Sequence, residues 1–121
     1  MNIDDAGHKF GSNSEEYACS ISKADTILGL YLPNWIEEGY NVIVTSDHGM
    51  NENKIHGGND YIQRYVPLYI FSNEESNMQK GDFSEKEISQ LNLAPLVCKL
   101  LGIDRSKRMK DIKEFGGTIF E

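Results

Sequence analysis

A short apolar segment, residues 40–46, constrains the fold of this chain more than any other feature of its sequence. The segment is rich in β-branched residues and lacks the alternation of polar and apolar residues that marks a half-exposed strand. Such segments are typical of strands that are buried on both faces of a parallel sheet. A second run, residues 66–71, predicts a neighbouring parallel strand, with Pro67 near its start, where a missing N–H is tolerated. We therefore expect residues 40–46 to form a central strand with Ile43 buried.

A longer segment, residues 13–32, predicts an amphipathic helix. Its apolar residues recur at steps of three and four, which places them in one stripe. The stripe comprises Tyr17, Ile21, Ala24, Leu28, Tyr31 and Trp35. A capping box at Ser12 or at Asn13 would begin the helix. Pro33 predicts a kink or a break, because its ring clashes with a carbonyl one turn earlier. We expect this helix to pack on one face of the sheet.

The remaining elements complete an α/β pattern. Residues 1–4 are expected to form the end of a strand that delivers Asp4 to a loop at residues 5–12. Asn92 and Gly102 are typical of the two ends of a second helix. This order of strands and helices predicts a layered α/β protein. Two full strands and one fragment are too few to cover helices on both sheet faces, so we expect an incomplete sheet.

Composition limits the classes of partner and the cellular setting. The chain has 121 residues, which suits one domain with its own core, and a net charge of −7, which argues against binding in a nucleic-acid groove. No run approaches the ~18 apolar residues of a membrane span. The first residues lack the basic and apolar regions of a signal peptide, which favours a cytoplasmic location for this piece. Cys19 and Cys98 are expected to be buried, reduced thiols.

All three histidines of the chain stand beside glycine and near carboxylates. Their contexts are Asp4-Asp5-Ala6-Gly7-His8, Asp47-His48-Gly49 and His56-Gly57-Gly58. Imidazole and carboxylate are usual ligands of Zn²⁺, and glycine lets the backbone turn close to an ion. A single histidine of this kind is more often an ordinary loop residue. Three of them together indicate metal binding or acid–base chemistry.

The candidate ligands number five. Asp4 and His8 are four residues apart and can turn toward one ion. Asp47 and His48 leave a strand at a sharp turn, and His56 returns through a short loop. Two carboxylates and three imidazoles are one ligand too many for a single tetrahedral zinc ion and too few for two. The count predicts a two-metal site that this chain supplies only in part.

These motifs belong to a longer set along the chain. The set comprises residues 4–11 (DDAGHKFG), 45–50 (TSDHGM), 56–58 (HGG), 66–68 (VPL) and 91–103 (LNLAPLVCKLLGI). Together they resemble the nucleotide pyrophosphatase/phosphodiesterase family of the alkaline phosphatase superfamily. The resemblance covers residues 1–103 and implies part of an alkaline-phosphatase-like, three-layer α/β sandwich, with a mostly parallel sheet flanked by helices.

The resemblance also implies a site and an activity. Asp4, His8 and His56 would bind one divalent metal ion, and Asp47 and His48 a second, with Zn²⁺ the expected metal. The implied activity is that of a phosphodiesterase or nucleotide pyrophosphatase acting on a small-molecule phosphodiester or nucleotide. Hydrolysis would proceed through a covalent intermediate on a threonine or serine.

That nucleophile is expected to lie upstream of Met1. Residues 1–103 would then be the C-terminal part of a catalytic domain and residues 104–121 a charged tail, and the chain alone is expected to be inactive. Thr45 lies within an expected strand, whereas nucleophiles usually occupy exposed turns. Open sheet edges could pair with another copy of the chain. The alternatives are a phosphomutase, sulfatase or phosphonate hydrolase of the same superfamily, or a non-enzymatic metal-binding module.

Overall fold

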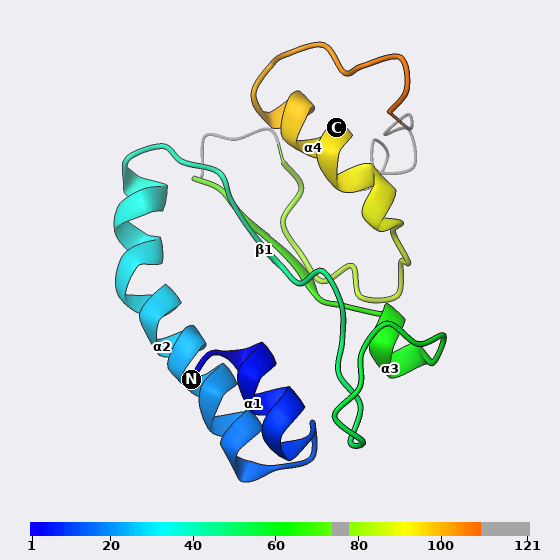
Figure 1. Cartoon of the computed structure of the whole chain (residues 1–121). Coiled ribbons are helices and arrows are strands. Elements are labelled where there is room, and N and C mark those ends of the chain that lie inside the picture. The colour runs from blue at the N-terminus through cyan, green and yellow to red at the C-terminus, as the bar shows by residue number, and fades with distance from the viewer. Residues whose placement is uncertain (74–77, 110–121) are drawn as a thin grey trace. The chain divides into compact units, whose positions relative to one another are not determined.

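A computed structural model describes residues 1–73 and 78–109 (Figure 1). The chain divides into two units, Met1–Asn73 and Glu74–Glu121. The first unit contains three helices and two strands, and the second contains a 3-10 turn followed by a helix. All five candidate ligands belong to the first unit. Within the described residues, no helix is both long enough and apolar enough to cross a membrane.

The chain begins with helix α1, Ile3–Phe10. The side chain of Asn2 caps it by accepting the N–H of Asp5 at 2.7 Å. Two aspartates lie in the first turn, where the positive end of the helix dipole favours them. The prediction of a strand end and a loop in this region is wrong. The capping signal was missed because the segment is short and polar.

Helix α2, Glu15–Glu37, follows after a short turn. Its N-cap is Ser14, whose hydroxyl accepts the N–H of Tyr17 at 3.1 Å. The predicted caps, Ser12 and Asn13, are therefore one or two residues too early. Ser14 is also held in place at the turn, because its hydroxyl donates to the carbonyl of Gly11 at 2.7 Å.

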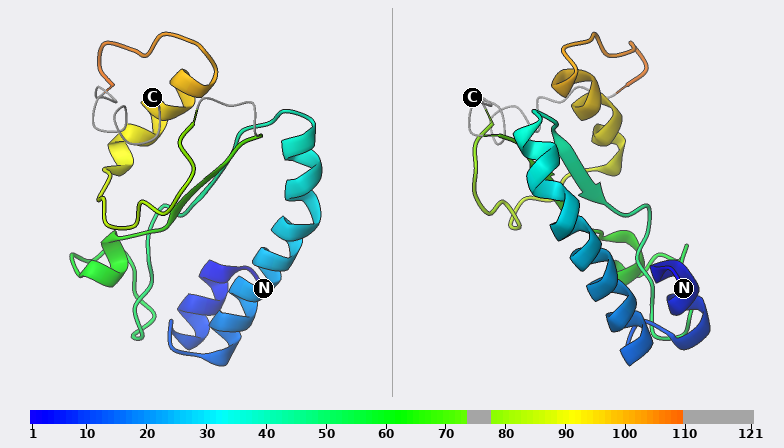
Figure 2. Two further views of the ribbon diagram at one scale, coloured as in Figure 1. Left: turned by 180° about the vertical axis from the view of Figure 1, so that it is seen from behind. Right: turned by 90° about the vertical axis from the view of Figure 1, so that its left-hand side faces the viewer.

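The apolar stripe of α2 is only partly buried. The helix continues through Pro33, so the predicted break is absent, and α1 lies alongside its N-terminal part (Figure 2). Contacts with the first strand are also present, as expected. Several large apolar residues of α2 are nevertheless exposed, namely Ile21, Ile27, Leu30, Tyr31 and Trp35. Cys19 on the same helix is exposed and Cys98 is half-buried, so the expectation of two buried thiols is wrong, although both are free.

The sheet consists of β1, Val42–Thr45, and β2, Leu68–Phe71. The two strands pair antiparallel, with Val42 opposite Phe71. The predicted parallel pairing is therefore wrong. Among the described residues β1 has a partner on one side only, so the expected central position is not observed. An apolar run predicts burial, whereas the direction of pairing depends on how the intervening loop returns. Ile43 is half-buried.

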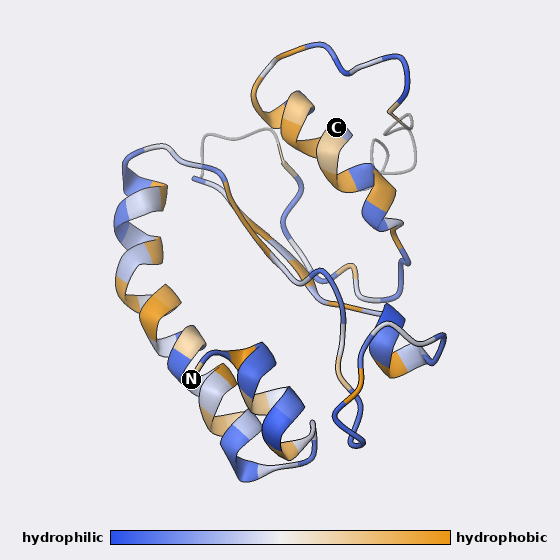
Figure 3. Ribbon diagram, viewed as in Figure 1, coloured by the Kyte–Doolittle hydropathy of each residue, from blue (hydrophilic) through white to orange (hydrophobic). Residues whose placement is uncertain are grey.

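The second unit, over its described residues, is built around α4, Leu93–Leu100, which follows the 3-10 turn η1, Gln90–Asn92. The predicted helix is confirmed, and Gly102 follows it with a φ of 65°. Asn92 is the N-cap of α4, as predicted, although its side chain makes no capping hydrogen bond, and Ser89 caps η1 by accepting the N–H of Leu91. Figure 3 shows how strongly apolar α4 is. Residues 110–121, most of the predicted tail, lie outside the described residues.

Candidate metal centre

Helix α1 supplies the first two candidate ligands from one face. Asp4 and His8 are separated by one helical turn, and Asp4 Oδ1 lies 3.6 Å from His8 Nε2. Both side chains are about half exposed, at 53% and 48%. Residues four apart on a helix are neighbours on its surface. The helix therefore achieves the convergence that we had expected from a loop.

The turn after β1 supplies the next pair. Asp47 Oδ1 accepts the backbone N–H of His48 at 3.0 Å, and the hydroxyl of Ser46 donates to the carbonyl of His48 at 2.7 Å. These two bonds hold the turn in one conformation. His48 Nε2 then lies 3.7 Å from Asp47 Oδ1 and 3.9 Å from Asp4 Oδ1. The imidazole of His48 thus faces carboxylates from two separate elements.

His56 completes the cluster from the loop between β1 and α3. Its ring stacks on His48, with centroids 3.8 Å apart, and meets the edge of His8, with centroids 4.9 Å apart. Ligand atoms of Asp4, His48 and His56 all lie within 4.8 Å of one another. This trio contains residues from both predicted ligand sets. His8 and Asp47 lie beside the trio, 3.6 Å from Asp4 and 3.7 Å from His48 respectively, so all five candidates are neighbours, and their division between two ions stays a prediction.

The hydrogen bonds of two histidines define which ring nitrogen is available. His8 Nδ1 lies 3.1 Å from the carbonyl oxygen of Lys54, and His48 Nδ1 lies 3.1 Å from the carbonyl oxygen of Gly49. A carbonyl only accepts, so each Nδ1 must be the protonated donor. In the neutral ring Nε2 is then an acceptor, and in both residues it faces the carboxylate of Asp4. Acceptors that face one another at this distance can be bridged by a donor such as water or by a metal ion, and the second alternative uses both Nε2 atoms and the carboxylate at once.

This donor set fits a divalent metal ion. Histidines that bind metals usually donate their other ring N–H to a backbone carbonyl or a carboxylate, which holds the ring in place. Neutral imidazole nitrogens and carboxylate oxygens suit Zn²⁺ and its neighbours. The cluster is also partly open, since Asp47 is 86% exposed while His48 is only 27% exposed. A small anionic ligand could therefore reach it from solvent.

The apolar part of the Asp-His-Gly-Met motif anchors the turn. Met50 is 4% exposed, and its side chain packs on Gly7 of α1, where a Cβ atom would come within 2.8 Å of it. Gly49 donates its N–H to the carbonyl of Gln63 at 2.9 Å. A Cβ atom at Gly49 would overlap the carbonyl oxygen of Ile62. These residues join the turn after β1 to α1 and to helix α3, Tyr61–Arg64.

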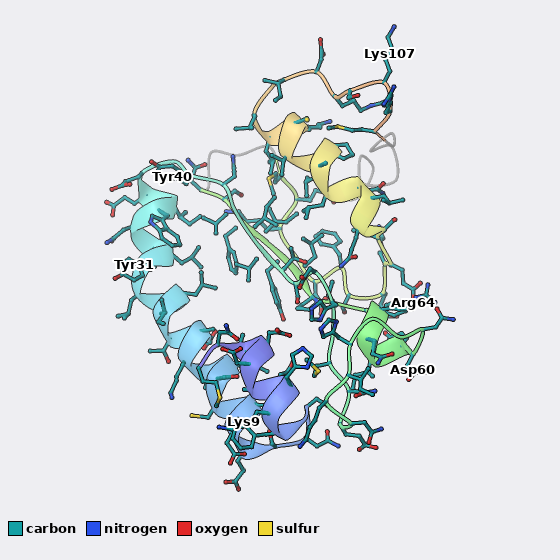
Figure 4. All side chains as sticks on the ribbon, viewed as in Figure 1. Lys9, Tyr31, Tyr40, Asp60, Arg64 and Lys107 are labelled. Atoms are coloured by element: carbon teal, nitrogen blue, oxygen red, sulfur yellow. The ribbon has the colours of Figure 1, made fainter. Side chains whose placement is uncertain are left out.

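Gln63 is a supporting residue that the sequence analysis missed. Its side chain is buried, with the residue 5% exposed, while its neighbour Arg64 projects outward (Figure 4). Its amide donates to the carbonyl of Ile55 at 3.2 Å and accepts the N–H of Asp60 at 3.4 Å. These bonds join both ends of the segment that carries His56. Asp60 and Gln63 have the three-residue spacing of a capping box, and this signal, which the sequence analysis did not use, could have pointed to Gln63.

Two glycine substitutions should change stability in opposite directions. Gly49→Ala is expected to lower the free energy of unfolding by about 2–3 kcal/mol, because its Cβ would displace a backbone carbonyl. Gly29→Ala lies inside α2 with open space around it and should raise stability by roughly 0.5–1 kcal/mol. Urea unfolding followed by circular dichroism measures both. Equal effects of the two substitutions would contradict the packing described for Gly49.

Comparison with known proteins identifies the family. The sequence pattern of the type I phosphodiesterase / nucleotide pyrophosphatase family matches residues 1–114. The chain belongs to this family. The resemblance inferred from the motifs is thereby confirmed, and phosphoester hydrolysis or transfer is the chemistry of the family and its relatives. No solved structure matches the chain significantly.

Curated relatives include GPI ethanolamine phosphate transferases. The catalytic subunit of GPI ethanolamine phosphate transferase 3 from Homo sapiens is 28% identical over 103 residues, which cover 85% of this chain and 9% of the relative. GPI ethanolamine phosphate transferase 2 from Schizosaccharomyces pombe is 30% identical over 119 residues, which cover 85% of this chain and 16% of the relative. The chain thus spans less than a fifth of the length of these relatives.

Proposed function

We propose that this chain carries most of the metal-binding part of the catalytic centre of a phosphodiesterase or phosphotransferase. Asp4, His8 and His56 would hold one divalent ion, and Asp47 and His48 would contribute to a second, with Zn²⁺ as the metal. The observation that carries the proposal is the pair of Nε2 atoms that face the carboxylate of Asp4 while both Nδ1 atoms are engaged by carbonyls. Membership of the family supports it.

The metal ions would supply the positive charge that this acidic chain lacks. The chain carries a net charge of −7, which disfavours a phosphate group unless positive charge is provided locally. Divalent ions bound at such a centre polarise phosphoryl oxygens and offset the charge that develops on them. The open side of the cluster, near Asp47, would admit the phosphate group of a small-molecule phosphodiester or nucleotide.

The nucleophile is proposed to be a threonine or serine outside this chain, acting through a covalent intermediate. Two hydroxyls lie close to the cluster in sequence, and both already donate hydrogen bonds to backbone carbonyls. Thr45 Oγ1 donates to Pro67 at 2.8 Å, and Ser46 Oγ donates to His48 at 2.7 Å. Their short bonds serve the strand pair and the turn. Ser46 Oγ also lies 3.5 Å from Asp47 Oδ1, but Asp47 is a proposed metal ligand, so its carboxylate would be engaged by the ion and would not activate this hydroxyl.

Transfer to an alcohol is a second candidate for the overall reaction. The relatives are named as ethanolamine phosphate transferases, so the group removed from the donor would pass to an acceptor hydroxyl instead of water. The metal cluster of this chain would serve either outcome. Incubating the full product of its gene with a phosphoethanolamine donor, with and without an alcohol acceptor, would separate the two through the product formed.

Zinc binding tests the proposed function directly on this chain. After equilibrium dialysis against Zn²⁺ and metal analysis, we expect at least one tightly held ion per chain and a second, weaker one, because two ligands leave much of the second coordination sphere to water. A matched sample of the His8→Ala, His56→Ala double variant should lose the tight ion. A wild-type chain that retains no more Zn²⁺ than the double variant would refute the proposal.

A further inference from the structure

The loop between the Asp-His-Gly-Met motif and His56 reaches back to α1 through one carbonyl group. Lys54 accepts the Nδ1 proton of His8 at 3.1 Å through its backbone oxygen. The φ angle of Lys54 is 67°, in the left-handed region that residues with a Cβ atom seldom adopt. Among the described residues, no other residue except glycine has a positive φ. The carbonyl that orients His8 is therefore presented by an unfavourable backbone conformation, which the surrounding loop must stabilise.

Asn51 makes the bonds that hold this conformation. Its backbone carbonyl accepts the N–H of Lys54 at 3.2 Å, and its own N–H donates to the carbonyl of Ile55 at 3.1 Å. Its side-chain oxygen accepts the N–H of Ile55 at 2.9 Å. The same backbone carbonyl also accepts the N–H of Ser12 at 3.2 Å, which ties the loop to the turn between α1 and α2. The N–H of Lys54 is thus bonded to the backbone of Asn51, and the N–H of the next residue, Ile55, is bonded to the side chain of Asn51.

We propose that Asn51 is a positioning residue for the metal ligand His8. By holding Lys54 in the left-handed conformation, it keeps a carbonyl against Nδ1 and so leaves Nε2 of His8 free to bind a metal ion. The metal-binding part of this inference rests on the proposed function. The tautomer of His8 does not, because it is a property of the metal-free chain.

Substitution of Asn51 tests the proposal with a matched conservative variant. Asn51→Ala removes the side-chain acceptor, whereas Asn51→Asp keeps an oxygen at the same position. We expect Asn51→Ala to lower Zn²⁺ affinity by about 10–100-fold, the range found when residues that orient metal ligands are removed. Asn51→Asp should stay close to the wild type. Competition with a chromophoric chelator gives the affinities.

A pair of substitutions at Lys54 isolates the backbone conformation. Lys54→Gly and Lys54→Val both remove the lysine charge, but only glycine adopts a positive φ without strain. Lys54→Gly should keep the Zn²⁺ affinity and raise the midpoint of urea unfolding. Lys54→Val should lose affinity to about the same extent as Asn51→Ala. Equal affinities of the two Lys54 variants would overturn the proposal.

Nitrogen chemical shifts of His8 provide a readout that needs no metal. In the metal-free wild-type chain, long-range proton–nitrogen spectra recorded at a pH where the ring is neutral should show its proton on Nδ1, and Asn51→Ala should shift it toward a mixture of tautomers. An unchanged tautomer in a variant that is merely less stable would mean that Asn51 is only structural, which refutes the positioning role. If the wild type binds no Zn²⁺, the proposed function fails, while these spectra still decide the proposal for Asn51.

Discussion

Replacing Asp4 by asparagine is expected to lower the Zn²⁺ affinity of this chain on the order of 100-fold or more, a larger effect than the loss of an orienting residue. Asp4 Oδ1 lies 3.6 Å from His8 Nε2 and 3.9 Å from His48 Nε2, so one carboxylate serves both imidazoles. Asparagine keeps the shape of the side chain but removes its charge. It also allows an amide N–H to face the imidazole acceptors, which would satisfy them without a metal ion.

Asp5→Asn is the matched control for this prediction. It makes the same change in charge one residue away on α1, beside a cap formed by its own backbone N–H. We expect its Zn²⁺ affinity to remain within a few-fold of the wild type, since exposed charges contribute little at a distance. Chelator competition at constant ionic strength measures both variants. Similar losses for Asp4→Asn and Asp5→Asn would show that general charge, not coordination by Asp4, governs metal binding.

The sequence predicted which residues gather in the cluster better than it predicted the elements that carry them. Three histidines beside glycine, together with two aspartates, were sufficient to nominate all five side chains. The local conformation was harder, because Asp4 and His8 converge on a helix that begins with a polar capping turn and has little apolar stripe. Short polar helices are stabilised by caps and by the elements they pack on, and neither leaves the periodic signal used to recognise a helix.

The direction of the sheet was not accessible from the strand segments. An apolar run without alternation is typical of a buried strand, but β1 and β2 are half-buried and pair antiparallel. Such runs are commonest in parallel sheets because helices usually cover both faces of those sheets, so the pattern indicates burial and does not fix the direction of pairing. The supporting contacts were equally hidden, because the carbonyl groups of Lys54 and Gly49 that orient two histidines are present in every residue type. Only the left-handed φ of Lys54 marks one of them as special.

The chain alone, supplied with excess Zn²⁺, is expected to hydrolyse neither phosphomonoesters nor phosphodiesters at a measurable rate. The reason lies in the hydrogen bonds of the two hydroxyls that are close to the cluster in sequence. Thr45 and Ser46 each donate a short hydrogen bond to a backbone carbonyl, and the carboxylate beside Ser46, that of Asp47 at 3.5 Å, is itself a proposed metal ligand. Loss of an activated nucleophile commonly costs several powers of ten in rate, on the order of 10⁴-fold to 10⁶-fold. The chain should therefore bind Zn²⁺ without catalysing hydrolysis.

A chromogenic phosphodiester and a chromogenic phosphomonoester, each incubated with the chain and with the full product of its gene, measure this separation. We expect turnover only from the full product, and loss of that turnover in its Asp4→Asn variant. The chain should nonetheless retain Zn²⁺ under the same conditions, which shows that its cluster is assembled. Zinc-dependent turnover by the chain itself, abolished by His8→Ala and by Thr45→Ala or Ser46→Ala, would place the nucleophile within these residues. In that case the cluster would be a complete catalytic centre, and one of the two hydroxyls would have to exchange its carbonyl partner for the substrate.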